Sequence, residues 1–196
     1  MTVPGDRDAS VAADIMRVIS GSAKGRRLSA VPGDTTRPIT DRVKESLFNI
    51  IGPEIQNSIF LDLFAGTGGV GIEALSRGAE SAWFIDSNRK AVKTIKANLE
   101  LTHLSDHARV FQANAFGFLD GPIKTEFDYI YIAPPQYKGM WLQALEILDT
   151  YPGWLAPDAW VIVQIHPREL SPISLKNLNE FDRRSYGSTL LLFLQR

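Results

Sequence analysis

The spacing of hydrophobic positions along this chain changes repeatedly between two patterns. Short apolar runs rich in β-branched and aromatic residues predict buried strands. These runs cover residues 58–63, 82–85, 109–112, 129–132 and 159–165. Between them, apolar positions three or four residues apart predict helices over residues 70–77, 89–101 and 140–148. Strands that alternate with helices form a parallel sheet covered on both faces, so we predict a Rossmann-like α/β fold.

The pattern differs at both ends of the chain. Two predicted closing strands, 181–185 and 189–194, are separated only by a turn at Tyr186-Gly187, which predicts an antiparallel hairpin at the sheet edge. Near the start, residues 17–19 and 27–31 predict two short strands around the turn-rich GSAKG.

A helix is predicted to follow this N-terminal hairpin. Its apolar positions Val43, Leu47, Ile50 and Ile51 have helical spacing, and Gly52-Pro53 ends it. Residues 1–15 have no such pattern and predict a disordered tail.

Composition narrows the class of protein. A chain of 196 residues, 44% of them hydrophobic and with a net charge of −1, suits one globular α/β domain with a small accessory element. The absence of cysteine excludes disulfides, thiolate metal sites and a cysteine nucleophile, and the three histidines lack partners at ligand spacing, so we expect no metal. No apolar run reaches the roughly 18 residues of a membrane span, and the start lacks a signal-peptide core. We expect a soluble, cytoplasmic protein with no membrane partner.

Positive charge is concentrated near the N-terminus. Residues 16–46 hold seven basic and three acidic side chains, an excess of four, so the rest of the chain carries −5. The basic residues are Arg17, Lys24, Arg26, Arg27, Arg37, Arg42 and Lys44. A basic element ahead of an acidic body is typical of a polyanion-binding appendage, although a solvated loop would have the same composition.

The first predicted strand ends in a glycine-rich motif. In LDLFAGTGGVG, Gly66, Gly68 and Gly71 satisfy G-x-G-x-x-G, and Asp86 ends the next strand, at a spacing that suits a carboxylate on ribose hydroxyls. Taken alone, the motif fits a nicotinamide dinucleotide as well as any other adenosine ligand. Asp62 disfavours the dinucleotide, because a carboxylate beside the loop repels a pyrophosphate and attracts an ammonium and a sulfonium, and S-adenosylmethionine carries both.

The fourth strand ends in the unusual sequence YIYIAPPQYKG. Pro135 forces Pro134 into an extended conformation, and neither proline has an N–H. The carbonyls of Ala133 and Pro134 are therefore expected to point out of the strand end as free acceptors. Such acceptors suit a planar amine.

These segments carry a family resemblance. LDLFAGTGGVGIEALSRGA, FIDSN and the Pro-Pro-x-Tyr segment resemble class I S-adenosylmethionine-dependent methyltransferases that modify exocyclic amines. MRVISGSAKGRRL followed by TRPITDRVKESLFNII resembles the RsmD family of 16S ribosomal RNA guanine-N2 methyltransferases, from about Met16 to the C-terminus. The resemblance implies a seven-stranded methyltransferase sheet at residues 53–196, preceded by a small RNA-binding hairpin and helix at 16–52 and a tail at 1–15.

The resemblance also implies roles for residues in three groups. S-adenosylmethionine would be held by Asp62, Phe64, Ala65, Gly66, Thr67, Gly68, Asp86, Ser87, Asn114 and Ala115. The catalytic loop would be Ala133, Pro134, Pro135 and Tyr137, with Tyr137 stacked on the flipped guanine. The seven basic residues given above would contact phosphates of ribosomal RNA, in a small-subunit assembly particle, and the protein is expected to act as a monomer.

Two positions depart from the family pattern. Ala133 stands where such enzymes usually have Asp or Asn as an acceptor, so the acceptor would be a backbone carbonyl or Gln136, or transfer would be slow or absent. Asn114 replaces a common Asp, but its oxygen can still accept a bond from adenine. Three interpretations remain open: a guanine-N2 methyltransferase, a catalytically silent RNA-binding or assembly protein, and a nicotinamide oxidoreductase. Methylation of an amine in DNA or on glutamine is a further alternative.

Overall fold

The computed structural model describes residues 16–33 and 39–196. Its strands are β1 Ile59–Asp62, β2 Ser81–Asp86, β3 Ala108–Gln112, β4 Phe127–Ile132, β5 Leu155–Ile165, β6 Asn179–Tyr186 and β7 Thr189–Gln195. Its α-helices are α1 Asp41–Ile51, α2 Gly69–Ser76, α3 Arg89–Thr102, α4 Ala115–Leu119 and α5 Met140–Thr150. None of the helices in this part of the chain has the length and apolar character that a bilayer crossing demands. The predicted tail, residues 1–15, lies outside the described residues.

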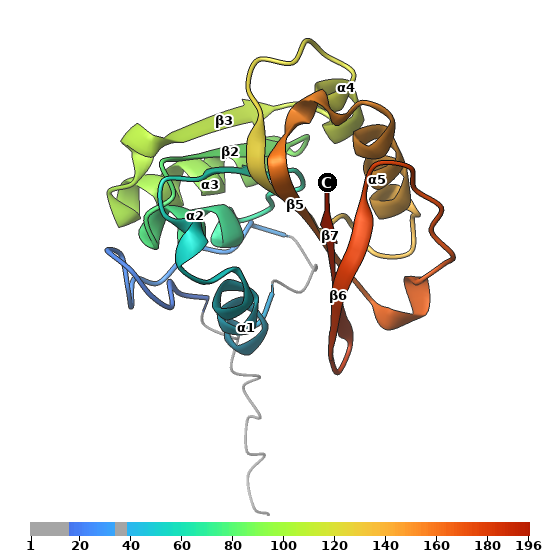
Figure 1. The fold of residues 1–196 in the computed structure, drawn as a ribbon. Helices are drawn as coiled ribbons and strands as arrows, with labels where there is room; N and C mark the ends of the chain where they lie inside the picture. Colours follow the sequence, from blue (N-terminus) through green and yellow to red (C-terminus); the bar gives the residue numbers. More distant parts are fainter. Residues whose placement is uncertain (1–15, 34–38) are drawn as a thin grey trace, which may run out of the picture.

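The strands form one seven-stranded sheet in the order β3-β2-β1-β4-β5-β7-β6 (Figure 1). The first five are parallel, whereas β7 runs antiparallel between β5 and β6. This arrangement confirms the predicted α/β sheet with its C-terminal antiparallel hairpin. The direction of winding reverses between β1 and β4, and ligands of open α/β sheets bind beyond the carboxyl ends of strands at such a switch point.

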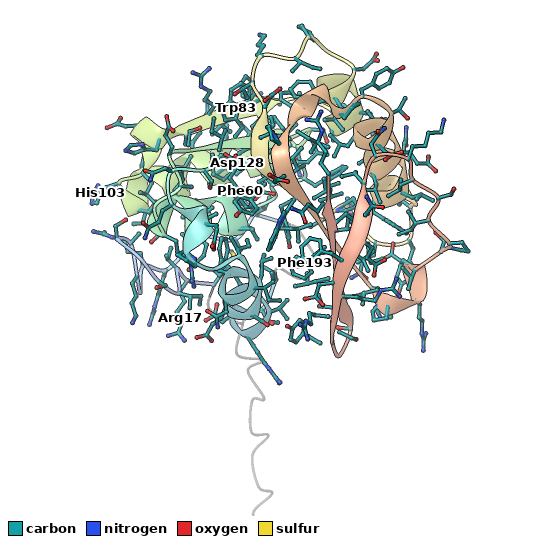
Figure 2. The ribbon with its side chains drawn as sticks, in the orientation of Figure 1. Arg17, Phe60, Trp83, His103, Asp128 and Phe193 are labelled. Carbon is teal, nitrogen blue, oxygen red and sulfur yellow. The ribbon has the colours of Figure 1, made fainter. Side chains whose placement is uncertain are left out.

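Two hydrophobic clusters cover the two faces of the sheet. One contains Phe60 and Phe193 of the sheet with buried residues of α1, α2 and α3. The other contains Trp83 with residues of α4 and α5, including Leu119 and Trp141. Figure 2 labels Phe60, Trp83 and Phe193 within these layers. We refer to the face covered by α1, α2 and α3 as the α1 face of the sheet, and to the face covered by α4 and α5 as the α5 face.

The N-terminal segment follows the path of the predicted hairpin but does not form two strands. A single antiparallel bridge joins Arg17 to Arg27. The physical reason is that side chains of α2 hold one arm: both carboxylate oxygens of Glu73 accept backbone N–H groups, from Ile19 at 2.8 Å and from Ser20 at 3.0 Å. Because these donors are satisfied by a side chain, they are not available for a longer ladder.

The same segment shares the core of the sheet. Met16, Val18 and Leu28 are buried in the cluster on the α1 face. Asn98 of α3, itself fully buried, accepts the backbone N–H of Ser29 at 2.8 Å. Residues 16–33 therefore pack against the sheet and share its hydrophobic core.

Candidate active site

The predicted cofactor residues gather at the carboxyl ends of β1, β2 and β3. Asp62 ends β1 and Asp86 ends β2, and Asn114 lies just after β3. The rings of Phe64 and Phe116 pack edge to face with centroids 6.1 Å apart, so the loop after β1 is in contact with α4, the helix that follows β3.

Asp62 closes the start of the helix that follows the glycine-rich loop. Its Oδ2 accepts the backbone N–H of Gly71, in the first turn of α2, at 3.2 Å. Free N–H groups at such a helix start are what a dinucleotide pyrophosphate would need. A Cβ at Gly71 would lie 2.4 Å from the ring of Phe84, so the third glycine of the motif is required for packing of α2 on β2.

The carboxyl group of Asp62 is buried, and burial raises its pKa to about 7, opposed by the Gly71 N–H and assisted by the negative charge of Asp86. Burial makes the charged form of a carboxyl group unfavourable, and a cation that binds nearby stabilises that form. This site therefore fits the ammonium and sulfonium of S-adenosylmethionine better than it fits a phosphate.

Asp86 is oriented by two backbone groups. Its Oδ2 accepts the N–H of Gly66 at 2.8 Å, and its Oδ1 accepts the N–H of Asn88 at 2.8 Å. Gly66 and Gly68 both have positive φ angles, 54° and 77°, a conformation that favours glycine. The loop is thereby fixed next to the carboxylate, whose remaining lone pairs can accept ribose hydroxyls.

The other predicted cofactor residues line the same edge. Ala65 is buried, and Ser87 is exposed beside Asp86. Thr67 donates its hydroxyl to the sulfur of Met16 at 3.3 Å, and its carbonyl accepts from Asn98 at 2.9 Å. The cofactor loop is thus attached to the N-terminal segment and to α3.

Asn114 has a different local role from the one expected. Its side-chain oxygen accepts the backbone N–H groups of Phe116 at 2.9 Å and Gly117 at 3.2 Å, so it caps α4, whose first residue is the buried Ala115. An adenine amino group would have to compete with these two donors for the same oxygen.

The loop after β4 presents an aromatic ring to solvent. Tyr137 has a φ of 59°, in the left-handed region that is uncommon for a non-glycine residue, and its residue surface is 63% exposed. Its backbone N–H donates to Oε2 of Glu169 at 2.7 Å. Local strain of this kind persists where surrounding contacts determine the conformation.

Glu169 and His166 hold this loop from the segment after β5. The other oxygen of Glu169 accepts the backbone N–H of His166 at 3.0 Å, and the rings of His166 and Tyr137 lie 5.8 Å apart at 41°. Sequence reasoning assigned no role to either residue. The motif HPRE carries no signal that it would reach Tyr137, because the contact exists only once β4 and β5 are paired.

The proline segment keeps its carbonyls free. Among the described residues, no backbone N–H donates to the carbonyl oxygen of Ala133 or Pro134. Pro134 is half-buried, whereas Pro135 and Gln136 are exposed. The expected acceptors are therefore available, while the Ala133 side chain itself packs against the apolar cluster on the α1 face.

The predicted RNA-binding residues divide into three groups. Five of them are exposed: Arg17, Lys24, Arg26, Arg27 and Arg42. Arg17 lies beside α1 and pairs with Asp41 at 2.8 Å (Figure 2). Arg37 lies outside the described residues.

Lys44 forms the third group and corrects the sequence prediction. It is 1% exposed, its Nζ lies 3.5 Å from a carboxylate oxygen of the fully buried Glu73, and it donates to the carbonyl of Arg17 at 2.5 Å. Burial lowers its pKa, against the opposing charge of Glu73. Lys44 cannot reach a phosphate, because its ammonium is enclosed between α1, α2 and the N-terminal segment.

Counting charges by sequence region missed a second basic surface. The exposed face of α3 carries Arg89, Lys90, Lys93 and Lys96. A Cβ at Gly33 would lie 3.8 Å from Nζ of Lys90, so the N-terminal segment runs beside this face. Together these residues extend the basic surface of the segment along α3.

A surface cavity of about 250 Å³ lies at the opposite edge of the sheet, where β1 and β4 begin. It is lined by Ser58 and Asp128, among others, and has no contact with the glycine-rich loop. The chemistry of the strand ends, and not this cavity, therefore identifies the candidate active site.

Comparison with known proteins identifies the family of this chain. A family model described as Conserved hypothetical protein 95 matches residues 16–195. The chain is 46% identical over 178 residues to YlbH of Bacillus subtilis (strain 168), a provisionally assigned rRNA methyltransferase, covering 89% of this chain and 95% of that protein. It is 37% identical over 149 residues to ribosomal RNA small subunit methyltransferase D of Escherichia coli (strain K12), covering 76% of this chain and 74% of that protein.

Structural comparison gives the same grouping. The Escherichia coli protein yhhF, provisionally assigned as a methyltransferase, superposes with a TM-score of 0.82 at 34% identity, over 93% of this chain and 98% of that structure. Sequence and fold match over almost the whole chain, from the basic N-terminal segment to the last strand. The chain therefore belongs to the Conserved hypothetical protein 95 family, the family of ribosomal RNA small subunit methyltransferase D.

Proposed function

We propose that this protein transfers a methyl group from S-adenosylmethionine to the exocyclic N2 amine of a guanosine in small-subunit ribosomal RNA. Its class, an S-adenosylmethionine-dependent rRNA methyltransferase, rests on the named relatives and on the shared fold. The guanine N2 target is the finer part of the proposal. The observation that carries it is the pair of free carbonyls at Ala133 and Pro134 beside the cofactor edge.

The chemistry asks for alignment and hydrogen-bond acceptors. The guanine amine is a weak nucleophile because its lone pair is delocalised into the ring, and acceptors on its two hydrogens localise that pair. Asp62 and Asp86 would hold the cofactor, the amine would take the methyl group from it, and the proton that the amine gives up would pass out of the site to solvent. The cofactor supplies an activated methyl group, so the residues of this chain have to orient the amine and exclude water.

The two competing interpretations make different demands on the site. A nicotinamide oxidoreductase would need the start of α2 for a pyrophosphate, but Asp62 occupies the N–H of Gly71 there. A silent RNA-binding protein would have no use for the positioned Asp86 carboxylate, nor for a strained Tyr137 held by Glu169. These observations favour an active enzyme.

The basic surface suits a ribosomal RNA partner. Exposed Arg26 and Arg27 and the cations of α3 lie on the side of the sheet that carries the glycine-rich loop. We propose that phosphates run along this surface while the target base enters the site and stacks on Tyr137. We propose that the protein acts on an assembling small subunit in the cytoplasm, because its proposed substrate is found there. We propose also that it acts as a monomer.

The direct test is methyl transfer. Labelled S-adenosylmethionine is incubated with small ribosomal subunits from cells that lack this protein, and in parallel with naked ribosomal RNA, followed by nucleoside mass spectrometry. We expect label in N2-methylguanosine, and more from the particle than from naked RNA. Label in another nucleoside would contradict the target. No label from a preparation that binds the cofactor would favour the silent RNA-binding protein.

The RNA surface is tested by salt dependence. Replacing Arg26 and Arg27 by Ala should weaken RNA binding and reduce the slope of log K against log salt by about 2, because each lost phosphate contact removes about 0.9. Lys124→Ala, at an exposed cation just ahead of β4, is the matched control and should leave the slope unchanged. An unchanged slope in the double variant would contradict the phosphate contacts.

A further inference from the structure

The proposed acceptor site lacks one side-chain oxygen, because position 133 has an alanine where related enzymes usually have Asp or Asn. The neighbouring strand provides one. In the parallel pairing of β4 with β5, Tyr131 lies beside Ile162 and Ile132 beside Val163. Extended by one residue beyond β4, this register puts Gln164, near the end of β5, beside Ala133.

Gln164 and Ala133 also share a face of the sheet. Side chains alternate along a strand, and Tyr131 and Ile162 both belong to the cluster on the α1 face. Gln164, two residues after Ile162, therefore points to this face, where Ala133 packs as well. The small alanine leaves room at the strand end that an Asp or Asn side chain would fill.

The amide of Gln164 is held in place. The hydroxyl of the buried Tyr131 donates to its Oε1 at 2.5 Å. Burial, with the nearby charge of Asp62, raises the pKa of Tyr131 well above its ordinary value, so the hydroxyl keeps its proton and remains a donor. An amide oxygen accepts two hydrogen bonds, so one lone pair of Oε1 remains available.

A row of polar side chains thus crosses the sheet at its carboxyl edge. Asp62 of β1 pairs in register with Tyr131 of β4, and Tyr131 bonds Gln164 of β5. One layer further from the carboxyl edge on the same face, Phe60, Tyr129 and Trp160 lie side by side and are apolar. The row starts at the cofactor carboxylate and ends beside the proline loop.

We propose that Gln164 is the catalytic acceptor that stands in for the missing side chain at position 133. Its Oε1 accepts one hydrogen of the target amine, and a carbonyl of the proline loop accepts the other. Tyr131 is a positioning residue that aims the amide. This assignment rests on the proposed function and names the residue that orients its substrate.

The test combines loss with rescue. Gln164→Leu should lower kcat for methyl transfer about 30-fold, the effect of losing one hydrogen bond to a group that becomes charged, with cofactor affinity unchanged. Adding Ala133→Asn to that variant should restore kcat to within a few-fold of the unaltered protein, because it returns an oxygen to the same place from the adjacent strand. Tyr131→Phe, which only frees the amide to rotate, should cost less than Gln164→Leu.

The outcomes separate the two proposals. Methyl transfer by the unaltered protein tests the proposed function. If the unaltered protein produces no N2-methylguanosine, both the proposed function and the assignment of Gln164 are overturned. Transfer with kcat for Gln164→Leu within twofold of the unaltered protein overturns only the assignment of Gln164. A double variant that binds cofactor normally but stays as slow as Gln164→Leu overturns it too, because a purely structural role would not be rescued from position 133.

Discussion

The two halves of the active-site edge are built in different ways. In the cofactor half, Asp62 accepts an N–H from α2, the helix that follows its own strand, and Asp86 accepts an N–H from the glycine-rich loop after the neighbouring strand β1. In the acceptor half, the loop with Tyr137 is exposed, and its position depends on Glu169 from another segment. Most of the cofactor half comes from one contiguous motif and the strand beside it, whereas the acceptor half is assembled from segments that are distant in sequence.

The largest effect is expected in the cofactor half. Asp86→Ala removes hydrogen bonds to a charged group, each contributing about 1.5 to 3 kcal/mol, and releases the N–H of Gly66. The dissociation constant for S-adenosylmethionine, measured by calorimetry, should rise about 100-fold while RNA affinity is unchanged. Asp106→Ala, at an exposed acid ahead of β3, is the control. A change below threefold would contradict the ribose role.

A change in the acceptor half should impair the reaction with RNA and leave the affinity for the cofactor unchanged. Tyr137→Ala should lower kcat/KM for RNA by about 10- to 30-fold, because stacking of an aromatic ring on a base contributes about 1 to 3 kcal/mol. Tyr137→Phe keeps the ring and should stay near the original value. Cofactor affinity should not change in either variant. If Tyr137→Ala also weakened cofactor binding, the acceptor half and the cofactor half would not act independently.

Acidity should affect the cofactor half through Asp62. Its pKa of about 7 in the folded protein lies above the unfolded value of 3.8, so the charged form opposes folding and stability falls as pH rises through this window. A cation binds the charged form, so affinity for S-adenosylmethionine should fall by up to tenfold per pH unit below about 7. Titration of binding from pH 5.5 to 8 should give this slope, and Asp62→Asn should flatten it. An unchanged slope in that variant would assign the proton to another group.

The smallest effect is expected for the clamp on the acceptor loop. Glu169→Ala leaves the N–H groups of Tyr137 and His166 without their acceptor, and kcat should fall about fivefold, with about 1 kcal/mol of stability lost in urea denaturation. Glu169→Gln keeps one acceptor oxygen, so its kcat should lie between that of the unaltered protein and that of Glu169→Ala. Equal rates in all three proteins would mean that the loop is held by other contacts.

The same contrast explains what the sequence could predict. The strands, the C-terminal hairpin and the glycine-rich loop were predicted because their signals are local: apolar spacing, turn residues and one contiguous motif. The burial of Lys44 was missed because charge counting treats every lysine as exposed, and its partner Glu73 belongs to another helix. Gln164 and Glu169 carry no local signal, since their neighbours are decided by strand pairing.

The attachment of the N-terminal segment has a consequence for how the chain folds. Ile19 is bound by a carboxylate 54 residues later, and Ser29 by an amide 69 residues later. A ribosome synthesises these arms well before it synthesises their partners, so they have nothing to dock on until α2 and α3 exist. Contacts of such long sequence separation form slowly. The N-terminal segment is therefore made before its partners and fixed in place late, and its cationic side chains remain free to meet nucleic acid during that interval.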